Sequence, residues 1–218
     1  MAMTQDDPTA VRFSDTIKDA SWNAHEHAEH SRYMQDLLAG RLDLRRYADL
    51  VAQQYFAYQV LEDASRHMAD DPVGGQFTFP ELRRIPALEA DLEDLLGAGW
   101  ADVITPTSGT ITYCDRLRSA CFEWSGGYVA HHYVRYMGDL SGGQVIRRIV
   151  ERTYELDGHK GTRFYVFDQI DDLKAFKEDY RQLLDSAPWS PEEQERIVEE
   201  ILLAYRLNTE VLDSLGPA

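Results

Sequence analysis

Three glycines lie inside a stretch that otherwise has the pattern of one long helix, from about Tyr128 to Tyr154. Gly138 and Gly142 are four residues apart and share a helical face, and Gly143 lies one position round it. Each glycine costs about 1 kcal/mol relative to alanine inside a helix. The strip indicates either a helix break or tight helix contact, or a backbone that touches a flat ligand at a kink. Asp139 lies beside it, either as an acid for chemistry or as an ordinary surface aspartate.

A histidine-rich segment near the N-terminus, His25-Glu-His-Ala-Glu-His30, has the residue types of a metal site. On a helix, His25 and His27 lie about 200° apart and cannot bind one ion together. His27 and His30 lie closer to each other, but no third ligand is near them in sequence. Glu29 follows His25 by one turn, where a carboxylate orients an imidazole ligand. The pair fits an axial haem ligand better than a zinc site.

The elements that position these residues are predicted to be helices from end to end, packed as an all-α, multi-helix, single domain over residues 1–218. Residues 1–11 are expected to be a flexible N-terminus. Gly126-Gly127 predicts a break, and Phe164–Phe167 gives the only weak strand signal. The predicted helices cover residues 12–38, 44–68, 86–97, 110–124, 128–154, 171–185 and 191–215.

The last predicted helix has one polar residue on its apolar stripe, Asn208, three residues after Tyr205. A buried amide without a hydrogen bond costs about 1–3 kcal/mol. Asn208 is therefore either a satisfied core amide or a polar group placed in a cavity.

Composition limits the class of protein. The 218 residues carry a formal net charge of −16, which excludes bulk-charge binding to nucleic acid or anionic membranes. No apolar run approaches the ~20 residues that cross a bilayer, and the start lacks the pattern of a signal peptide. We expect a cytoplasmic monomer without a membrane anchor. Cys114 and Cys121 are predicted to be reduced core thiols, because seven helical residues span about 10.5 Å.

The run Val129-Ala-His-His-Tyr-Val-Arg-Tyr-Met-Gly-Asp-Leu-Ser-Gly-Gly-Gln-Val145 resembles the signature of the haem oxygenase family. The segment His25–Met34 resembles that family's proximal-histidine segment. Three further segments match its C-terminal half in order and spacing, and the similarity covers about residues 12–215. These segments are Phe164–Phe167, Phe176–Arg181 and Tyr205–Asn208.

The resemblance implies that haem lies between a proximal N-terminal helix and a kinked, glycine-rich distal helix. His25 would ligate the iron, with Glu29 beside it, and Asp139 would anchor a distal water network. One departure from the family is Trp22, where a second basic residue is common. The remaining implied roles are the distal helix over the porphyrin (Gly138, Gly142, Gly143), further members of the water network (Tyr58, Tyr113, Arg135, Asn208) and the haem propionate contacts (Lys18, Tyr133, Lys177, Arg181).

The implied activity is cleavage of haem b, both substrate and cofactor, at a meso carbon. The α carbon is expected. The products would be biliverdin, CO and Fe²⁺, for iron acquisition. O₂ and electrons from a ferredoxin or an NAD(P)H-dependent reductase would be needed, and the partner would dock on a basic patch drawn from Arg116, Arg118, Lys177 and Arg181.

Three alternatives remain open at this point. The first is a haem-binding or haem-storage protein on the same fold. The second is a thiaminase-like hydrolase that uses Cys114 or Cys121 as its nucleophile. The third is a helical interaction module without enzymatic activity.

Overall fold

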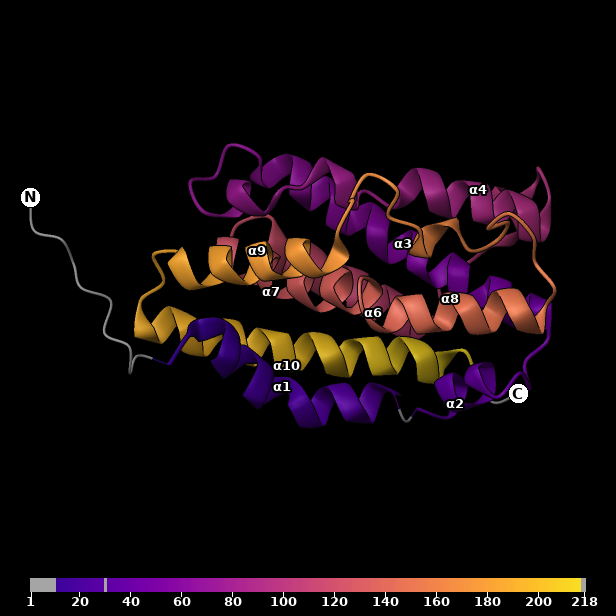
Figure 1. The fold of residues 1–218 in the computed structure, drawn as a ribbon, viewed down its shortest axis with the longest axis horizontal. Helices are drawn as coiled ribbons and strands as arrows, with labels where there is room; N and C mark the ends of the chain where they lie inside the picture. The colour runs from indigo at the N-terminus through magenta and orange to yellow at the C-terminus, as the bar shows by residue number, and fades with distance from the viewer. Residues whose placement is uncertain (1–10, 30, 217–218) are drawn as a thin grey trace, which may run out of the picture.

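The computed structural model describes residues 11–29 and 31–216, and the elements in these ranges are helices. Figure 1 shows them as long rods that run roughly parallel to one axis. The α-helices are α1 (Phe13–Glu29), α2 (Arg32–Leu38), α3 (Leu44–Met68), α4 (Ile85–Leu96), α5 (Trp100–Val103), α6 (Ser108–Cys121), α7 (Ser125–His132), α8 (Gly142–Thr153), α9 (Leu173–Ser186) and α10 (Pro191–Ser214). Shorter 3₁₀ turns cover Gly74–Phe77, Pro80–Leu82 and Arg163–Tyr165, and Tyr133–Met137 is a π-helix.

Two long helices organise the core. The helix α10 packs against α1, α6 and α7, and α3 packs against α4 and α6. Figure 1 shows α1 and α10 side by side along one edge and α4 along the opposite edge, with α3 running obliquely between these edges. The all-α fold predicted from the sequence is confirmed.

Several helix ends follow the local capping rules. Asp43, Thr107 and Ser190 each accept a hydrogen bond from a backbone N–H of the first turn of their helix, which satisfies a donor that has no intrahelical partner. Gly97 ends α4 with a positive φ of 84°. These signals are local in sequence, so the predicted bounds of α3, α4 and α10 lie close to the observed ones.

Three sequence predictions are wrong in detail. The stretch 12–38 is two helices, because the Ser31 side chain caps a new one. Gly126 and Gly127 do not break a helix but lie in the first turn of α7. A Cβ on Gly126 would lie 2.6 Å from Glu193 Oε1, and one on Gly127 would lie 2.5 Å from the Trp124 ring. Both glycines therefore permit close packing.

The third wrong prediction is the strand at 164–167, which is a 3₁₀ turn. Its backbone is hydrogen-bonded to side chains instead of a second strand. The Asp91 carboxylate accepts from the N–H groups of Arg163 and Phe164 at 2.9 and 2.8 Å. The Arg84 guanidinium donates to the carbonyls of Phe164 and Val166. Two side chains buried among neighbouring elements thus fix a segment that the local sequence does not define.

The predicted long helix 128–154 is interrupted, as the glycine strip indicated. The helix α7 leads into the π-helix Tyr133–Met137, the chain turns at Leu140 and Ser141, and α8 begins at Gly142. Single π turns inside helices are frequent at functional sites.

Among the residues that the structure describes, no helix combines the length and the apolar character that crossing a lipid bilayer requires.

Candidate functional site

A cavity of about 190 Å³ lies between the glycine-rich segment and α10. The walls come from α2, α3, the π-helix, α8 and α10, so segments far apart in sequence meet there. The side chains are mostly apolar, with a few polar groups, which is the usual character of a small-molecule site. The lining residues are Met34, Leu50, Gln54, Val134, Arg135, Gly138, Asp139, Gly142, Gly143, Ile146, Tyr165, Tyr205, Asn208, Val211 and Leu212.

The three glycines differ in what their missing side chains leave open. A Cβ on Gly138 or Gly142 would meet no atom within 4 Å, so both positions face open space along the cavity wall. A Cβ on Gly143 would lie 3.0 Å from the Tyr165 ring. Gly138 and Gly142 therefore leave a bare strip of backbone that a flat ligand can cover, whereas Gly143 is needed for packing against Tyr165.

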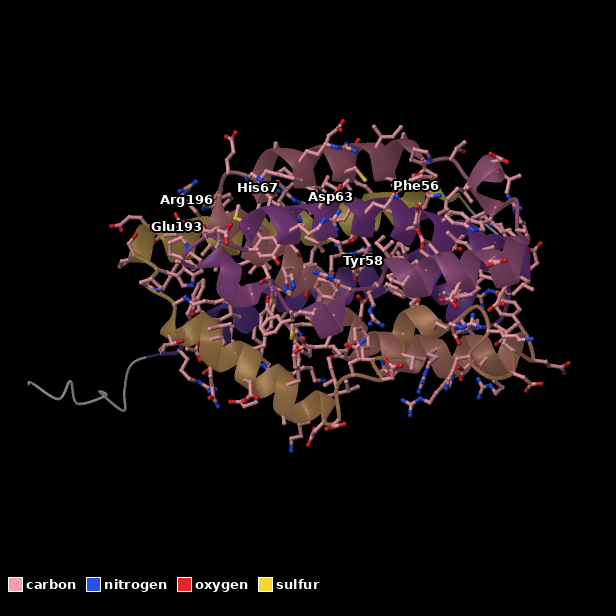
Figure 2. All side chains as sticks on the ribbon, turned by 90° about the horizontal axis from the view of Figure 1, so that it is seen from above. Phe56, Tyr58, Asp63, His67, Glu193 and Arg196 are labelled. Carbon is pink, nitrogen blue, oxygen red and sulfur yellow. The ribbon has the colours of Figure 1, made fainter. Side chains whose placement is uncertain are left out.

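Asp139 is held at the cavity wall by one neutral donor. The Tyr58 hydroxyl donates a hydrogen bond to Asp139 Oδ2. Tyr58 is fully buried on α3, in the interior of the molecule (Figure 2), where its ring packs edge-on against those of Tyr136 and Phe164. Burial raises the pKa of Asp139 to about 6, against the attraction of Arg135 and the hydrogen bond from Tyr58. A carboxyl group with this pKa can both hold and release a proton near neutral pH.

Arg135 lies beside Asp139 but is bound by two amides. Its Nη1 donates to Asn208 Oδ1 and its Nη2 donates to Gln54 Oε1. The guanidinium carbon lies 4.8 Å from the centroid of the Tyr58 ring and 5.6 Å from that of Tyr113. Asn208 also donates to the Ala204 carbonyl at 2.9 Å, so the amide is both hydrogen-bonded and exposed to a cavity.

The structure thus brings together the five residues expected in the distal network, namely Tyr58, Tyr113, Arg135, Asp139 and Asn208. It adds Gln54, which the sequence analysis missed. The signal was available, because Gln54 precedes Tyr58 by one helical turn and shares its face of α3.

Two buried polar atoms near the cavity have no hydrogen-bond partner among the described residues, the Tyr113 hydroxyl and Arg135 Nε. Unpaired buried donors are costly, and they are usually satisfied by ordered water or ligand. Together with the bare glycine strip, they fit a site that holds a flat ligand and water.

The four residues expected to bind carboxylates come from three elements. Lys177 Nζ donates to Ser141 Oγ at 3.0 Å, which places α9 next to the turn in the glycine motif. Arg181 follows Lys177 by one turn. Burial raises the pKa of the half-buried Tyr133, and the nearby charge of Arg181 opposes that rise. Lys18 is exposed on α1, and Lys18 and Arg181 both attract Asp15.

His25 and Glu29 lie in α1, but their side chains lie outside the part of the chain that the structure describes. Their predicted roles stay predictions. Arg116 and Arg118 of the expected docking patch are both in ion pairs, with Glu200 and Asp115.

Cys114 and Cys121 are both buried, free thiols. Burial raises the pKa of each, so neither is favoured as a thiolate nucleophile.

The all-helical fold encloses a glycine-walled cavity with one acid of raised pKa at its wall, which suits a protein that binds a planar ligand and transfers protons beside it. A model of the family described as "Heme oxygenase" matches residues 11–214. The heme oxygenase of Porphyra purpurea is 34% identical over 200 residues, which are 92% of this chain and 85% of that protein.

Two solved structures are similar over most of their length. The heme oxygenase-1 of Synechocystis sp. in complex with heme has a TM-score of 0.89 and 34% identity, covering 94% of this chain and 93% of that one. Heme oxygenase-2 from the same organism, in complex with heme and NO, has a TM-score of 0.90 and 34% identity, covering 94% and 85%. The chain belongs to the haem oxygenase family. It is a haem-degrading oxidoreductase that uses haem as substrate and cofactor, with O₂ and an external electron donor.

Proposed function

We propose that this enzyme opens the haem ring at a meso carbon, with the α carbon as the expected position, and releases biliverdin, CO and Fe²⁺. The observation that carries the proposal is the Tyr58–Asp139 pair beside a strip of backbone without side chains. Haem supplies an iron that binds O₂ and the ring carbon that is oxidised. The protein must position the ring, keep other donors away from the bound gas and deliver protons.

The distal residues divide these tasks. Gly138 and Gly142 present no side-chain donor to the cavity, so a proton reaches the reacting oxygen through water. Asp139 holds that proton, since burial raises its pKa to about 6. The Tyr58 hydroxyl fixes the carboxyl group by donating to Oδ2. Arg135 and Asn208 close the far side of the cavity.

The remaining residues would hold the ring. His25 is proposed as the iron ligand, oriented by Glu29, because one carboxylate one turn away is the pattern that orients an imidazole. Lys18, Lys177, Arg181 and the Tyr133 hydroxyl are proposed to bind the two propionates and so set the rotation of the ring in its plane.

The reductant is proposed to be a ferredoxin or an NAD(P)H-dependent reductase. A chain of net charge −16 repels an acidic protein, so docking needs local cations. Lys177 on α9 suits this best, because it donates to Ser141 and to a backbone carbonyl. The charges of Arg116, Arg118 and Arg181 are each paired with a carboxylate. The free buried thiols suit a reducing compartment, so we propose a cytoplasmic, monomeric, single-domain enzyme that releases iron from haem.

The test is turnover of one equivalent of haemin with ascorbate under air, followed by absorption. We expect the Soret band to decay into the spectrum of biliverdin, with CO detected as released gas. A stable haem complex that never bleaches would instead identify the storage protein. His25→Ala should still take up haem but lose the native ligation and the bleaching, whereas His27→Ala should keep both.

A further inference from the structure

The inference concerns the way Arg135 is kept from pairing with Asp139. The two residues are four positions apart in one helical segment, where opposite charges are neighbours and commonly form an ion pair. In the described part of the chain they form none. The two terminal nitrogens of Arg135 donate hydrogen bonds to the side-chain carbonyls of Gln54 and Asn208. Asp139 accepts a hydrogen bond from the neutral Tyr58 hydroxyl.

Of the two amides that accept from Arg135, Asn208 has a role implied by the family resemblance, whereas Gln54 has none. Its Oε1 accepts from Arg135 Nη2 at the cavity wall and so links α3 to the π-helix. The guanidinium is nearly enclosed, with its face over the Tyr58 ring. Loss of the Gln54 acceptor would leave a second donor of this guanidinium unpaired beside Nε, and an unpaired buried donor costs about 1–3 kcal/mol and more when charged.

We propose that Gln54 is a positioning residue, which with Asn208 holds the Arg135 guanidinium on neutral amides and so keeps Asp139 free of a cationic partner. The consequence for turnover rests on the proposed function, in which Asp139 supplies protons, but the arrangement itself does not depend on turnover.

Of the titratable and charged groups around Asp139, Arg135 is the one whose position most affects the ionisation of the carboxyl group. Tyr58 on α3, Tyr136 on the π-helix and Tyr165 on the 3₁₀ turn are all buried tyrosines that stay neutral. The second cation is Arg84, whose guanidinium is held by four backbone carbonyls: those of Glu81, Leu82, Phe164 and Val166. Arg135 is therefore the cation whose position a single neighbouring side chain can change.

The experiment follows the carboxyl group of Asp139 by carbon NMR in haem-free protein labelled at aspartate, with Asp139→Asn to assign the signal. In Gln54→Leu the Nη2 donor loses its acceptor and turns to Asp139. Because an opposite charge within a few ångströms favours the ionised acid, the midpoint should fall by about 1 pH unit or more. In Gln54→Glu the guanidinium stays clamped and its charge is offset, so the midpoint should rise.

The control is Gln59→Leu, on the same helix, where the exposed amide donates only to the Tyr55 hydroxyl. It should titrate as the wild type. An unchanged midpoint of Asp139 in Gln54→Leu, with a native circular dichroism spectrum, would overturn the proposal. A lower midpoint in Gln54→Glu would also overturn it. The glutamate variant therefore tests the proposal even if the leucine variant does not fold. Failure of the wild type to make biliverdin would refute the proposed function while leaving this titration valid.

Discussion

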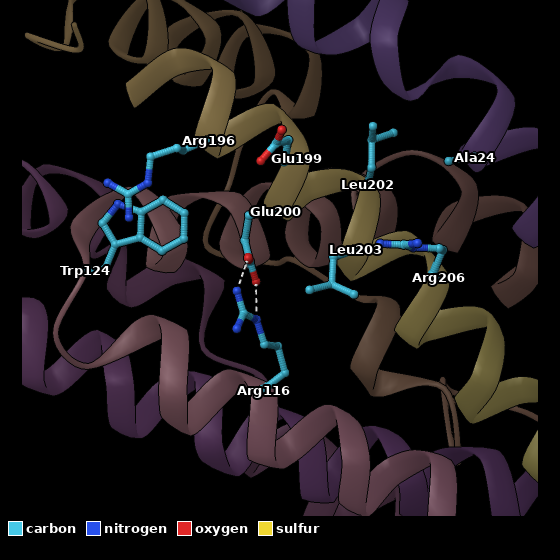
Figure 3. Close-up of a pocket in the computed structure, with 9 residues that line it drawn as sticks. All are labelled: Ala24, Arg116, Trp124, Arg196, Glu199, Glu200, Leu202, Leu203 and Arg206. Carbon is cyan, nitrogen blue, oxygen red and sulfur yellow. Dashed lines mark hydrogen bonds and ion pairs between the residues drawn. The ribbon is translucent and has the colours of Figure 1, made fainter. Parts of the chain in front are cut away.

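Two carboxyl groups, Asp139 and Glu200, are both largely shielded from water but differ in their partners. Asp139 faces the cavity and accepts from a neutral tyrosine. Glu200 on α10 accepts from Arg116 Nε at 2.8 Å, from Arg116 Nη2, and it lies 2.8 Å from His131 Nε2. Figure 3 shows Arg116 reaching from α6 to Glu200 at a wide surface hollow between the helices.

The difference appears in the pKa values. Burial alone would raise the pKa of Glu200, but the hydrogen bonds from Arg116 and His131 bring it down to about 2. At Asp139 burial prevails and the pKa is about 6. Of these two carboxyl groups, the one that accepts no hydrogen bond from a cation keeps the raised pKa. Where a cation is bound directly, the same burial makes a permanent ion that joins helices.

The largest effect is expected from Asp139→Ala. Removing the carboxyl group should leave haem binding nearly intact, because the bare strip at Gly138 and Gly142 is unchanged. It should lower the rate of biliverdin formation by about 10²-fold or more, as expected for the loss of a proton donor. The measurement is single-turnover conversion of bound haem with ascorbate, with hydrogen peroxide as a second oxidant.

With peroxide, the Asp139→Ala variant should oxidise an added phenol faster than the wild type, since protons no longer arrive in the productive direction. Asp139→Asn should keep part of the activity, because an amide still orders water. The exposed Asp102→Ala serves as control. Wild-type rates of biliverdin formation in Asp139→Ala would show that Asp139 takes no part in proton delivery and that water alone delivers the proton.

The sites of Asp139 and Glu200 also differ in how much of each could be predicted from the sequence. The helix bounds and the glycine strip follow from local patterns, and Asp139 is conspicuous because it lies among helix-interior glycines. Glu200 and His131 give no such signal, since their pairing depends on α7, α6 and α10 meeting in space. The division of labour between Gly138 and Gly143 likewise depends on where the Tyr165 ring lies, which helical spacing does not define.

The next effect is on stability, at Glu200. Replacing it by glutamine removes the charge that compensates Arg116, and because Arg116 is 37% exposed and screened by solvent, breaking the pair costs about 1–2 kcal/mol. We expect the free energy of unfolding of the haem-free protein at pH 7 to fall by roughly that amount in urea denaturation. Biliverdin formation per folded molecule should stay at the wild-type level, because Glu200 does not line the cavity.

The contribution of Glu200 to the free energy of unfolding should decrease as the pH falls. The pKa of Glu200 is lower in the folded state than its ordinary value of 4.5, so its stabilisation is present above about pH 4.5 and is lost as the pH falls toward about 2. The wild type should lose stability over that range more steeply than Glu200→Gln. The neighbouring exposed Glu199→Gln should behave as the wild type. Equal acid sensitivity of all three proteins would contradict the ion-pair interpretation.

The smallest effect distinguishes the cavity wall from the packed core within the glycine motif itself. Gly138 has helical φ and ψ of −62° and −49°, and a Cβ there meets open space, so Gly138→Ala should stabilise the haem-free protein by up to about 1 kcal/mol. The same methyl group would occupy the wall on which the ring is proposed to lie, so haem affinity should fall. Gly143→Ala should do the reverse, because its Cβ would lie 3.0 Å from the buried Tyr165 ring, which would have to shift out of its packed position. We expect it to lower the free energy of unfolding by about 1 kcal/mol, with a smaller change in haem affinity.

Thermal unfolding without haem and haem titration of both variants measure the two quantities. If the two substitutions shift stability in the same direction, then the glycines share one role, and the separation of ligand-facing and core-facing positions is wrong.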